Sequence, residues 1–192
     1  MTDFLDVASG AHGTVNQNTN RYSIGPTIEL HLPFGFGVEF DVLYRHFSYN
    51  STANLVDVFS TSRTTAGNWE FPLLVKKNLG KSPLRPFVDA GVNFSKLSGL
   101  SQSVESVLSP NRITSSSTGS PAELQDDFSK GFVMGAGVDF HLLMIHVTPE
   151  LRYTRWGSQM FNSSVISGAV STLGGSVTSN QNQAEFLVGF TF

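Results

Sequence analysis

The sequence is dominated by segments in which apolar and polar residues alternate with a period of two. This alternation places one class of side chain on each face of a β-strand. Most of these segments are about 9 to 12 residues long, which is longer than the ~5–6 residues of an average soluble strand and close to the ~9–11 of a membrane-spanning one. The seven segments are Arg21–Leu32, Phe36–Phe47, Trp69–Lys76, Arg85–Ser95, Ser129–His141, His146–Thr154 and Gln183–Phe192.

The connections between these segments are short and long in turn. Three are short turns, at Pro33–Gly35, Asn78–Leu84 and Leu142–Ile145. The other three are long and polar, at 48–65, 97–127 and 157–181. A meander with every short turn at one end and every long loop at the other is typical of a transmembrane β-barrel. We therefore predict an all-β fold, an antiparallel up-and-down transmembrane β-barrel of the eight-stranded type with seven full strands visible.

The charged residues indicate which face of the strands is turned toward lipid. The apolar face carries no acidic residue, and its cations lie near strand ends, where a long side chain can reach the membrane interface. A cation at mid-bilayer would cost roughly 2–4 kcal/mol. The cations of the apolar face are Lys77, Lys96, Lys130 and Arg155. The charged residues of the polar face are Glu29, Glu39, Asp41, Glu70, Asp89, Asp139, Glu150 and Glu185, with Arg21, Arg45, Lys76, Arg85 and Arg152.

Glycine placement supports the same orientation. The glycines on the charged face are Gly25, Gly37, Gly91, Gly131, Gly135, Gly137 and Gly189. Small residues suit a crowded concave interior, and an eight-stranded barrel is just wide enough for side chains to fill it. We therefore interpret the apolar face as lipid-facing and the charged face as a filled polar interior. A soluble up-and-down barrel with a ligand inside is the alternative interpretation.

Composition and motifs exclude several classes of function. Charged residues make up 14% of the chain and the net charge is −3, which argues against a nucleic-acid-binding face of clustered Lys and Arg. The chain has no cysteine, and it contains no Gly-x-Ser-x-Gly or His-Glu-x-x-His motif. His31, His141 and His146 lie on the polar face near the short turns, where we interpret them as solvated side chains. We expect no catalytic, cofactor-binding or metal-ligating residue, no cofactor and no nucleic-acid partner.

The last strand carries the most specific motif. In Glu185–Phe192, apolar residues alternate up to a C-terminal phenylalanine. With this strand, the chain from Arg21 to Phe192 resembles the small OmpA-like, OmpX-like and opacity-protein-like barrels of Gram-negative bacteria, although Gly189 is placed differently from the usual pattern. The resemblance implies the bacterial outer membrane, outer-membrane lipid as the surrounding partner, turns in the periplasm and exposed loops. It also implies that the barrel-assembly machinery reads Phe186, Val188, Phe190 and Phe192.

The start of the sequence carries a further expectation. We treat residues 1–192 as a single outer-membrane β-barrel domain, in which residues 1–20 are the remnant of a first strand and the first exposed loop. Bacterial single-chain barrels have an even number of strands, so we expect that the signal peptide and most of strand 1 precede Met1. In that case Asp3–Ala8 pairs across part of the gap, or a slot remains between Ile24–Leu32 and Phe186–Phe192.

The expected function follows from the interior and the loops. We predict a network of ion pairs inside the barrel, because a lone charge in that confined space would be costly. Its residues are Glu39, Asp41, Arg45, Glu70, Lys76, Arg85, Asp89, Glu150, Arg152 and Glu185. The chain is expected to be non-enzymatic, with a structural role or an interaction and adhesion role carried by loops whose partner the sequence does not name. A small-solute channel is the second hypothesis, and a soluble lipocalin-like binder of a small ligand is the third.

Overall fold

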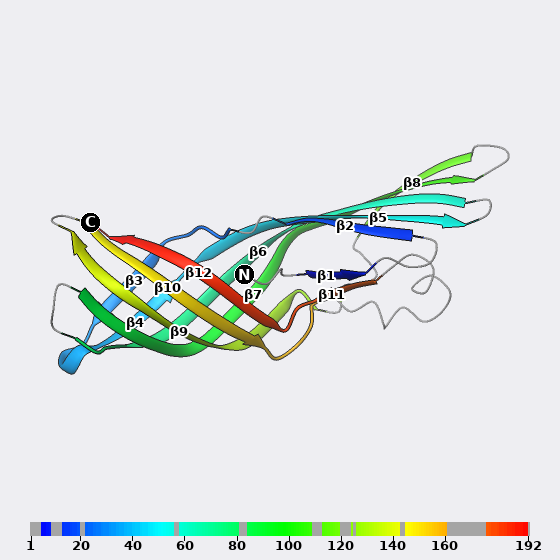
Figure 1. Ribbon diagram of the computed structural model, residues 1–192. Helices are drawn as coiled ribbons and strands as arrows, with labels where there is room; N and C mark the ends of the chain where they lie inside the picture. Colours follow the sequence, from blue (N-terminus) through cyan, green and yellow to red (C-terminus); the bar gives the residue numbers. More distant parts are fainter. Residues whose placement is uncertain are drawn as a thin grey trace.

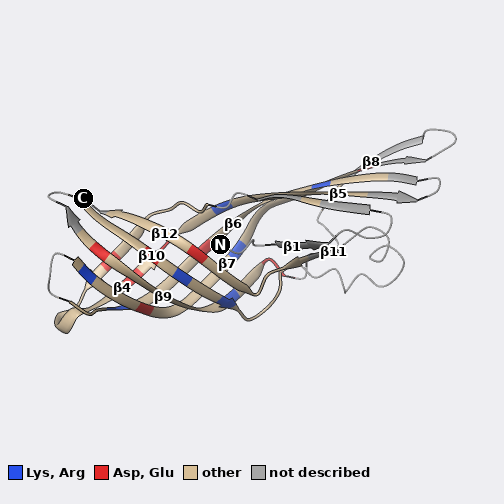
Figure 2. Cartoon of the chain, in the orientation of Figure 1, with Lys and Arg blue, Asp and Glu red and all other residues tan. Residues whose placement is uncertain are grey.

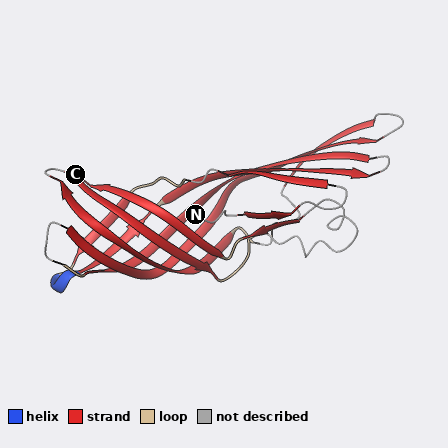
Figure 3. Cartoon of the chain, in the orientation of Figure 1, coloured by secondary structure: helices blue, strands red, loops and turns tan. Residues whose placement is uncertain are grey.

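The structure is a computed structural model that describes residues 5–8, 13–19, 22–55, 58–80, 84–108, 113–119, 124, 126–142, 145–160 and 176–191. Nearly all of these residues lie in antiparallel strands, as Figure 3 shows. A single turn of 3-10 helix, η1 (Pro33–Gly35), forms the predicted short turn between the first two predicted strand segments. No helix within the described ranges is long and apolar enough to cross a membrane.

The strands form one large curled sheet and a small two-stranded one (Figure 1). The large sheet has the order β12-β10-β9-β7-β6-β4-β3, with β5 also on β6, β2 on β5 and β8 on β7; β1 pairs with β11. This path contains one strand from each of the seven predicted segments and confirms the antiparallel barrel-type fold. The strands are β1 (Leu5–Ala8), β2 (Gly13–Thr19), β3 (Thr27–His31), β4 (Phe36–Asp41), β5 (Leu43–Leu55), β6 (Val58–Asn78), β7 (Leu84–Leu108), β8 (Ile113–Gly119), β9 (Phe128–Leu142), β10 (Ile145–Trp156), β11 (Ser176–Ser179) and β12 (Asn182–Thr191).

We call the curled part of the large sheet the wall. Its first two strands along the chain are interrupted where they were predicted to be continuous. The regular ladder between them stops near Pro26 and Val42, and Ile24 pairs with Tyr44 only as an isolated bridge. Pro26 has no N–H to give to a ladder. Its carbonyl instead accepts a hydrogen bond from Val42 N at 3.0 Å. Gly25 lets the two backbones meet here, because an added Cβ would lie 1.6 Å from the Val42 carbonyl oxygen.

The apolar face of the wall is turned outward, as predicted. Phe40, Val92, Met134, Leu151 and Val188 are exposed and Phe71 is half-buried. Neighbours in sequence show the contrast most clearly, since Leu73 is 44% exposed and Leu74 is 1% exposed. A soluble barrel would enclose its apolar face instead, so the lipocalin-like hypothesis is wrong.

Two of the three predicted long loops are wrong in large part. Most of 48–65 belongs to the paired strands β5 and β6, and much of 97–127 belongs to β7 and β8. Together with β2, these strands continue the sheet beyond its curled part as a long ribbon, which we call the extension (Figure 1). The prediction failed because both faces of the extension are polar, which removes the period-two signal that identifies a half-buried strand.

The outer strands of the curled sheet each have one free side. Within the described residues, β3 pairs only with β4 and β12 pairs only with β10. Of the expected partial strand Asp3–Ala8, the structure describes Leu5–Ala8, which pairs with β11 in the separate two-stranded sheet and with neither β3 nor β12. The pairing runs from Leu5 with Ser179 to Ala8 with Ser176. Leu5–Ala8 therefore pairs with the segment that precedes β12, while β12 itself keeps one free side within the described residues.

Placing a charge at the middle of the outward face should destabilise the fold. Met134 on β9 is 46% exposed there, while its neighbour Val133 is fully buried inside. We expect Met134→Arg to lower the free energy of unfolding in lipid vesicles by about 2–4 kcal/mol. Urea unfolding followed by tryptophan fluorescence measures this difference, and Met134→Leu is the matched control. Equal stability of the Arg and Leu variants would contradict the lipid-facing assignment.

Candidate functional site

Figure 2 shows Asp, Glu, Lys and Arg residues along the strands of the curled sheet. Burial places those that the alternation pattern assigned to the polar face on its inner side. The predicted network residues lie as follows: Glu39 and Asp41 on β4, Arg45 on β5, Glu70 and Lys76 on β6, Arg85 and Asp89 on β7, Glu150 and Arg152 on β10, and Glu185 on β12. All of them are buried except the half-buried Arg85 and Glu185. The concave face therefore collects charges from most of the wall.

Arg152 is the centre of this face. Its Nε donates to Glu150 Oε1 at 2.6 Å, and its Nη1 donates to Asp41 Oδ2 at 2.6 Å. Its Nη2 donates to Glu39 Oε1 at 3.0 Å. The planar guanidinium is suited to several carboxylates at once. Because β9, β7 and β6 separate β10 from β4 in the sheet, the bonds to Asp41 and Glu39 cross the interior and connect opposite parts of the wall.

Lys76 extends the same group of charges toward β3. Its Nζ lies 3.0 Å from Glu29 Oε2 and 3.3 Å from Glu39 Oε2, so Glu39 is shared with Arg152. The ammonium also lies 4.0 Å from the centroid of the Phe87 ring. Phe87 is an exception to the alternation on β7, and this cation–π contact gives an inward aromatic ring a function.

A second group of charges lies nearer the extension. Arg45 on β5 forms an ion pair with Glu185 on β12, and its Nη2 lies 3.8 Å from Glu70 Oε1. Glu70 also accepts a hydrogen bond from Asn93 Nδ2 at 3.1 Å. Because β10, β9, β7 and β6 separate β12 from β5 in the sheet, this ion pair connects distant parts of the wall across the interior.

Neutral polar side chains complete this second group, and sequence reasoning missed them. Asn68 Nδ2 donates to Glu70 Oε1 at 3.1 Å, and Ser95 Oγ donates to Asn68 Oδ1 at 2.7 Å. Trp156 Nε1 donates to Gln183 Oε1 at 2.8 Å. Their position on the charged parity of each strand was the signal that could have identified them.

Asp89 lies against a glycine of the neighbouring strand β9. A Cβ added to Gly135 would lie 2.6 Å from Asp89 Oδ1 and 2.7 Å from Glu150 Oε1, so both carboxylates occupy the space that this glycine leaves. Among the described residues, Asp89 Oδ1 has no hydrogen-bond partner. Arg85 lies at the start of β7, near the short turn, in register with Asp139 on β9. The structure thus places Asp89 beside the Arg152 group and Arg85 nearer the short turns.

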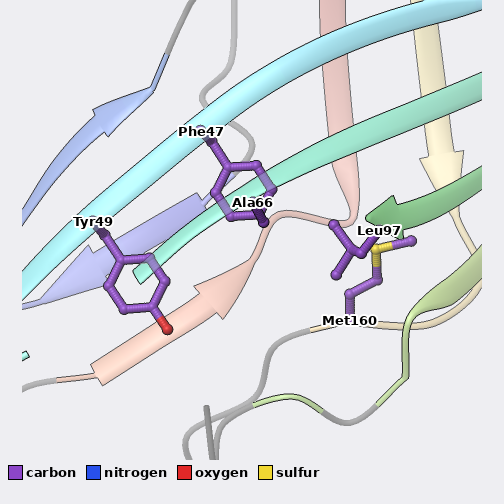
Figure 4. Close-up of a cluster of buried hydrophobic side chains, with 5 residues drawn as sticks. All are labelled: Phe47, Tyr49, Ala66, Leu97 and Met160. Carbon is purple, nitrogen blue, oxygen red and sulfur yellow. The ribbon is translucent and has the colours of Figure 1, made fainter. Parts of the chain in front are cut away.

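Apolar side chains cover the interior at the end that faces the extension. Figure 4 shows this cluster, which we call the apolar cap: Phe47, Tyr49, Ala66, Leu97 and Met160. Leu100 and Leu124 pack against it. Phe47 follows Arg45 by two residues on the same inward face of β5, so the cap lies directly beyond the second charge group. Sequence reasoning missed the cap because several of its members lie in the segments interpreted as loops.

The described residues contain no cluster of three or more His, Cys, Asp or Glu side chains arranged for a metal ion. His31 Nε2 lies 3.4 Å from Glu29 Oε1 at the short-turn end. Of the predicted assembly-signal residues, Phe186, Val188 and Phe190 are exposed on the outward face of β12, whereas Phe192 falls outside the described residues. Recognition of this strand by the assembly machinery stays a prediction.

Removing the central cation should destabilise the barrel strongly. Arg152→Met keeps the volume of the side chain but leaves Glu39, Asp41 and Glu150 without their main partner. We expect a loss of about 3–5 kcal/mol in the free energy of unfolding, the usual cost of an uncompensated buried charge. Urea unfolding in vesicles provides the measurement. Leu151→Met, the neighbouring position on the same strand but exposed, is the control and should cost about 1 kcal/mol or less. Similar losses in both variants would show that the interior ion pairs do not support the fold.

Comparison with known proteins gives the family. A family model described as an outer membrane protein beta-barrel domain matches residues 1–157. No curated protein and no solved structure matches the chain. The matched range contains the strands from β1 to β10, and with them Arg152, Lys76 and their carboxylate partners. With its outward apolar face and charged interior, this chain belongs to the outer membrane protein β-barrel domain family and is a protein of the bacterial outer membrane.

Proposed function

We propose that this protein is a non-enzymatic barrel that acts through its extension, with the barrel wall as the membrane anchor and the extension as a surface for interaction or adhesion. The observation that carries the proposal is the order of the extension. Segments with a loop-like composition are instead five paired strands, β2, β5, β6, β7 and β8. A surface that is already ordered loses less conformational entropy on binding than flexible loops do.

The outer face of the extension offers hydrogen-bonding groups in a regular row. One row runs in register across all five strands, and its members are Asn16, Asn50, Arg63, Ser103 and Thr118. All of them are exposed. With strands about 4.8 Å apart, such a row spans roughly 19 Å. Amide, hydroxyl and guanidinium groups at this spacing suit a broad polar partner surface.

The interior favours a role of the wall as a membrane anchor over a role as a small-solute channel. Arg152 crosses the interior to Asp41 and Glu39, and both partners are at least nine-tenths buried. The apolar cap lies beyond these ion pairs, on the side of the extension. A small-solute channel would need a hydrated path through both layers, so the described part of the interior does not favour that hypothesis.

Removing the extension should separate anchoring from interaction. Tyr49 and Thr64 are in register, so a two-residue Asn-Gly turn can join them and replace 50–63, which keeps the residues of the apolar cap. A second deletion replaces 102–119, which contains the paired parts of β7 and β8, with a short Gly-Ser linker. We expect the doubly trimmed protein to reach the outer membrane and to keep its heat-modifiable gel shift. Adhesion of producing cells to cultured epithelial cells should fall to the level of cells that lack the protein.

The matched control changes the interior instead of the extension. Asp89→Asn keeps the shape of a buried side chain and lies far from the deleted strands, so adhesion should stay at the wild-type level. Equal adhesion of the trimmed and wild-type proteins would contradict the proposal. Steady single-channel steps of the wild-type protein in a planar bilayer would also contradict it, because they require the open path that the ion pairs and cap obstruct.

A further inference from the structure

One part of the outward face carries three neighbouring cations. Lys96 on β7, Lys130 on β9 and Arg155 on β10 are all exposed. In the sheet register, Phe94 pairs with Lys130 and Phe132 pairs with Arg155, so each cation is a diagonal neighbour of the next. Diagonal neighbours on adjacent strands are about 7–8 Å apart, and their long side chains can converge on one ligand. The three cations lie toward the extension end of the wall.

A surface groove lies at two of these cations, Lys130 and Arg155. It has a volume of about 390 Å³, and its side walls include Val92, Phe94, Lys130, Phe132 and Arg155. Gly131 and Gly157 also line it, and neither adds a side chain to fill it. The Phe94 and Phe128 rings stack beside it with centroids 6.3 Å apart. The groove therefore joins a basic upper edge to an apolar wall.

Within the part of the chain that the structure describes, no carboxylate forms an ion pair with the cations of this groove. Among the described residues, Lys96 and Lys130 have no carboxylate within salt-bridge distance, and Arg155 donates only to the neutral Asn182, at 3.3 Å. The acidic residues of the wall strands face the interior instead. Two exposed acidic residues lie nearby, Asp126, whose Oδ1 accepts a hydrogen bond from Phe128 N, and Asp127, whose backbone carbonyl accepts one from Leu97 N at 2.8 Å. In the described structure, neither forms an ion pair with a cation of the groove. A ligand that complements the groove is thus negatively charged at its upper edge.

The outward Lys77 shows how an outward cation behaves when the protein does satisfy it. This residue lies at the opposite, short-turn end of the wall. Its Nζ donates to the Phe34 carbonyl at 2.7 Å and lies 3.8 Å from the centroid of the Phe36 ring. Lys96 and Lys130 have no comparable contacts in the described structure. Their grouping around a groove therefore needs a separate explanation.

We propose that this groove binds the phosphate-bearing headgroup of an anionic membrane lipid. The phosphate sits between Lys130 and Arg155, with Lys96 added from its diagonal position next to Lys130, and the acyl chains run along the outward apolar face past Val92 and Phe132. A lipid is favoured over a free phosphate ion because the groove opens onto the lipid-facing wall, where a ligand with an apolar body gains contact area. Basic pockets at the membrane surface bind lipid headgroups in this way.

The test compares lipid retention by the refolded full chain in a mild detergent, using native mass spectrometry. The probes are phosphatidic acid, phosphatidylcholine of the same acyl chains, and inorganic phosphate as a competitor. We expect the wild-type protein to retain phosphatidic acid preferentially. Loss of one cation, as in Lys130→Gln, should weaken retention about fivefold, and the combined K96Q/K130Q/R155Q variant should weaken it roughly 100-fold. Lys77→Gln is the matched control and should retain phosphatidic acid like the wild type.

Each other outcome counts against the proposal. Equal retention by the wild-type and triple variants, or equal retention of phosphatidic acid and phosphatidylcholine, would overturn it. Displacement of the lipid by inorganic phosphate at comparable concentration would show a simple anion site and overturn the assignment to a lipid. The gel shift on heating verifies that each variant is folded. If the triple variant does not fold, the single Lys96→Gln and Lys130→Gln variants give the same comparison.

Discussion

When a single β-sheet has lipid on its outer face, its charged residues must lie on the concave inner face and find ion-pair or hydrogen-bond partners there. Arg152 meets this requirement by bonding to Glu150 on its own strand and to Glu39 and Asp41 across the interior. Most other features of the interior depend on this arrangement. Lys76 shares Glu39, and the glycine at 135 leaves room for the carboxylates beside the guanidinium. Since single-sided loss of such a pair is costly, the strands cannot shift register by one residue without exposing charge to lipid.

Lipid also explains which parts of the fold could be predicted from the sequence. Where a strand crosses the membrane, one face meets lipid and the other meets the charged interior. Each position therefore requires either an apolar or a polar side chain, and the alternation can be recognised in the sequence. Leu151 and Arg152 illustrate this, since neighbouring positions take opposite classes of residue and are 67% and 3% exposed. Outside the wall this constraint disappears. Ser103 and Arg63 lie in paired strands, yet their segments were interpreted as loops because both faces are polar.

The interior network was predictable by residue type and side, but not by partner. The alternation placed Arg45 and Glu185 on one face, whereas only the curvature of the sheet decides that strands β5 and β12 approach each other across the interior. The contacts of apolar residues on the inner face could not be predicted from the alternation. Phe87 contacts Lys76 and Phe47 joins the apolar cap, and both roles depend on neighbours from other strands. The basic groove around Lys130 belongs to the same class, because each cation alone resembles an interfacial anchor.

Labelling of the native protein by a membrane-dissolved diazirine tests the central claim most directly. Carbene insertion read at single residues by mass spectrometry reports which side chains touch lipid. The adjacent pair Leu73 and Leu74 has the same chemistry but opposite orientation, with 44% and 1% exposure, and Met134 and Val133 form a second such pair. We expect strong labelling of Leu73 and Met134 in vesicles and little at Leu74 and Val133. Equal labelling within each pair, or labelling of the inner members alone, would contradict a barrel-type wall with lipid outside and charged side chains buried inside.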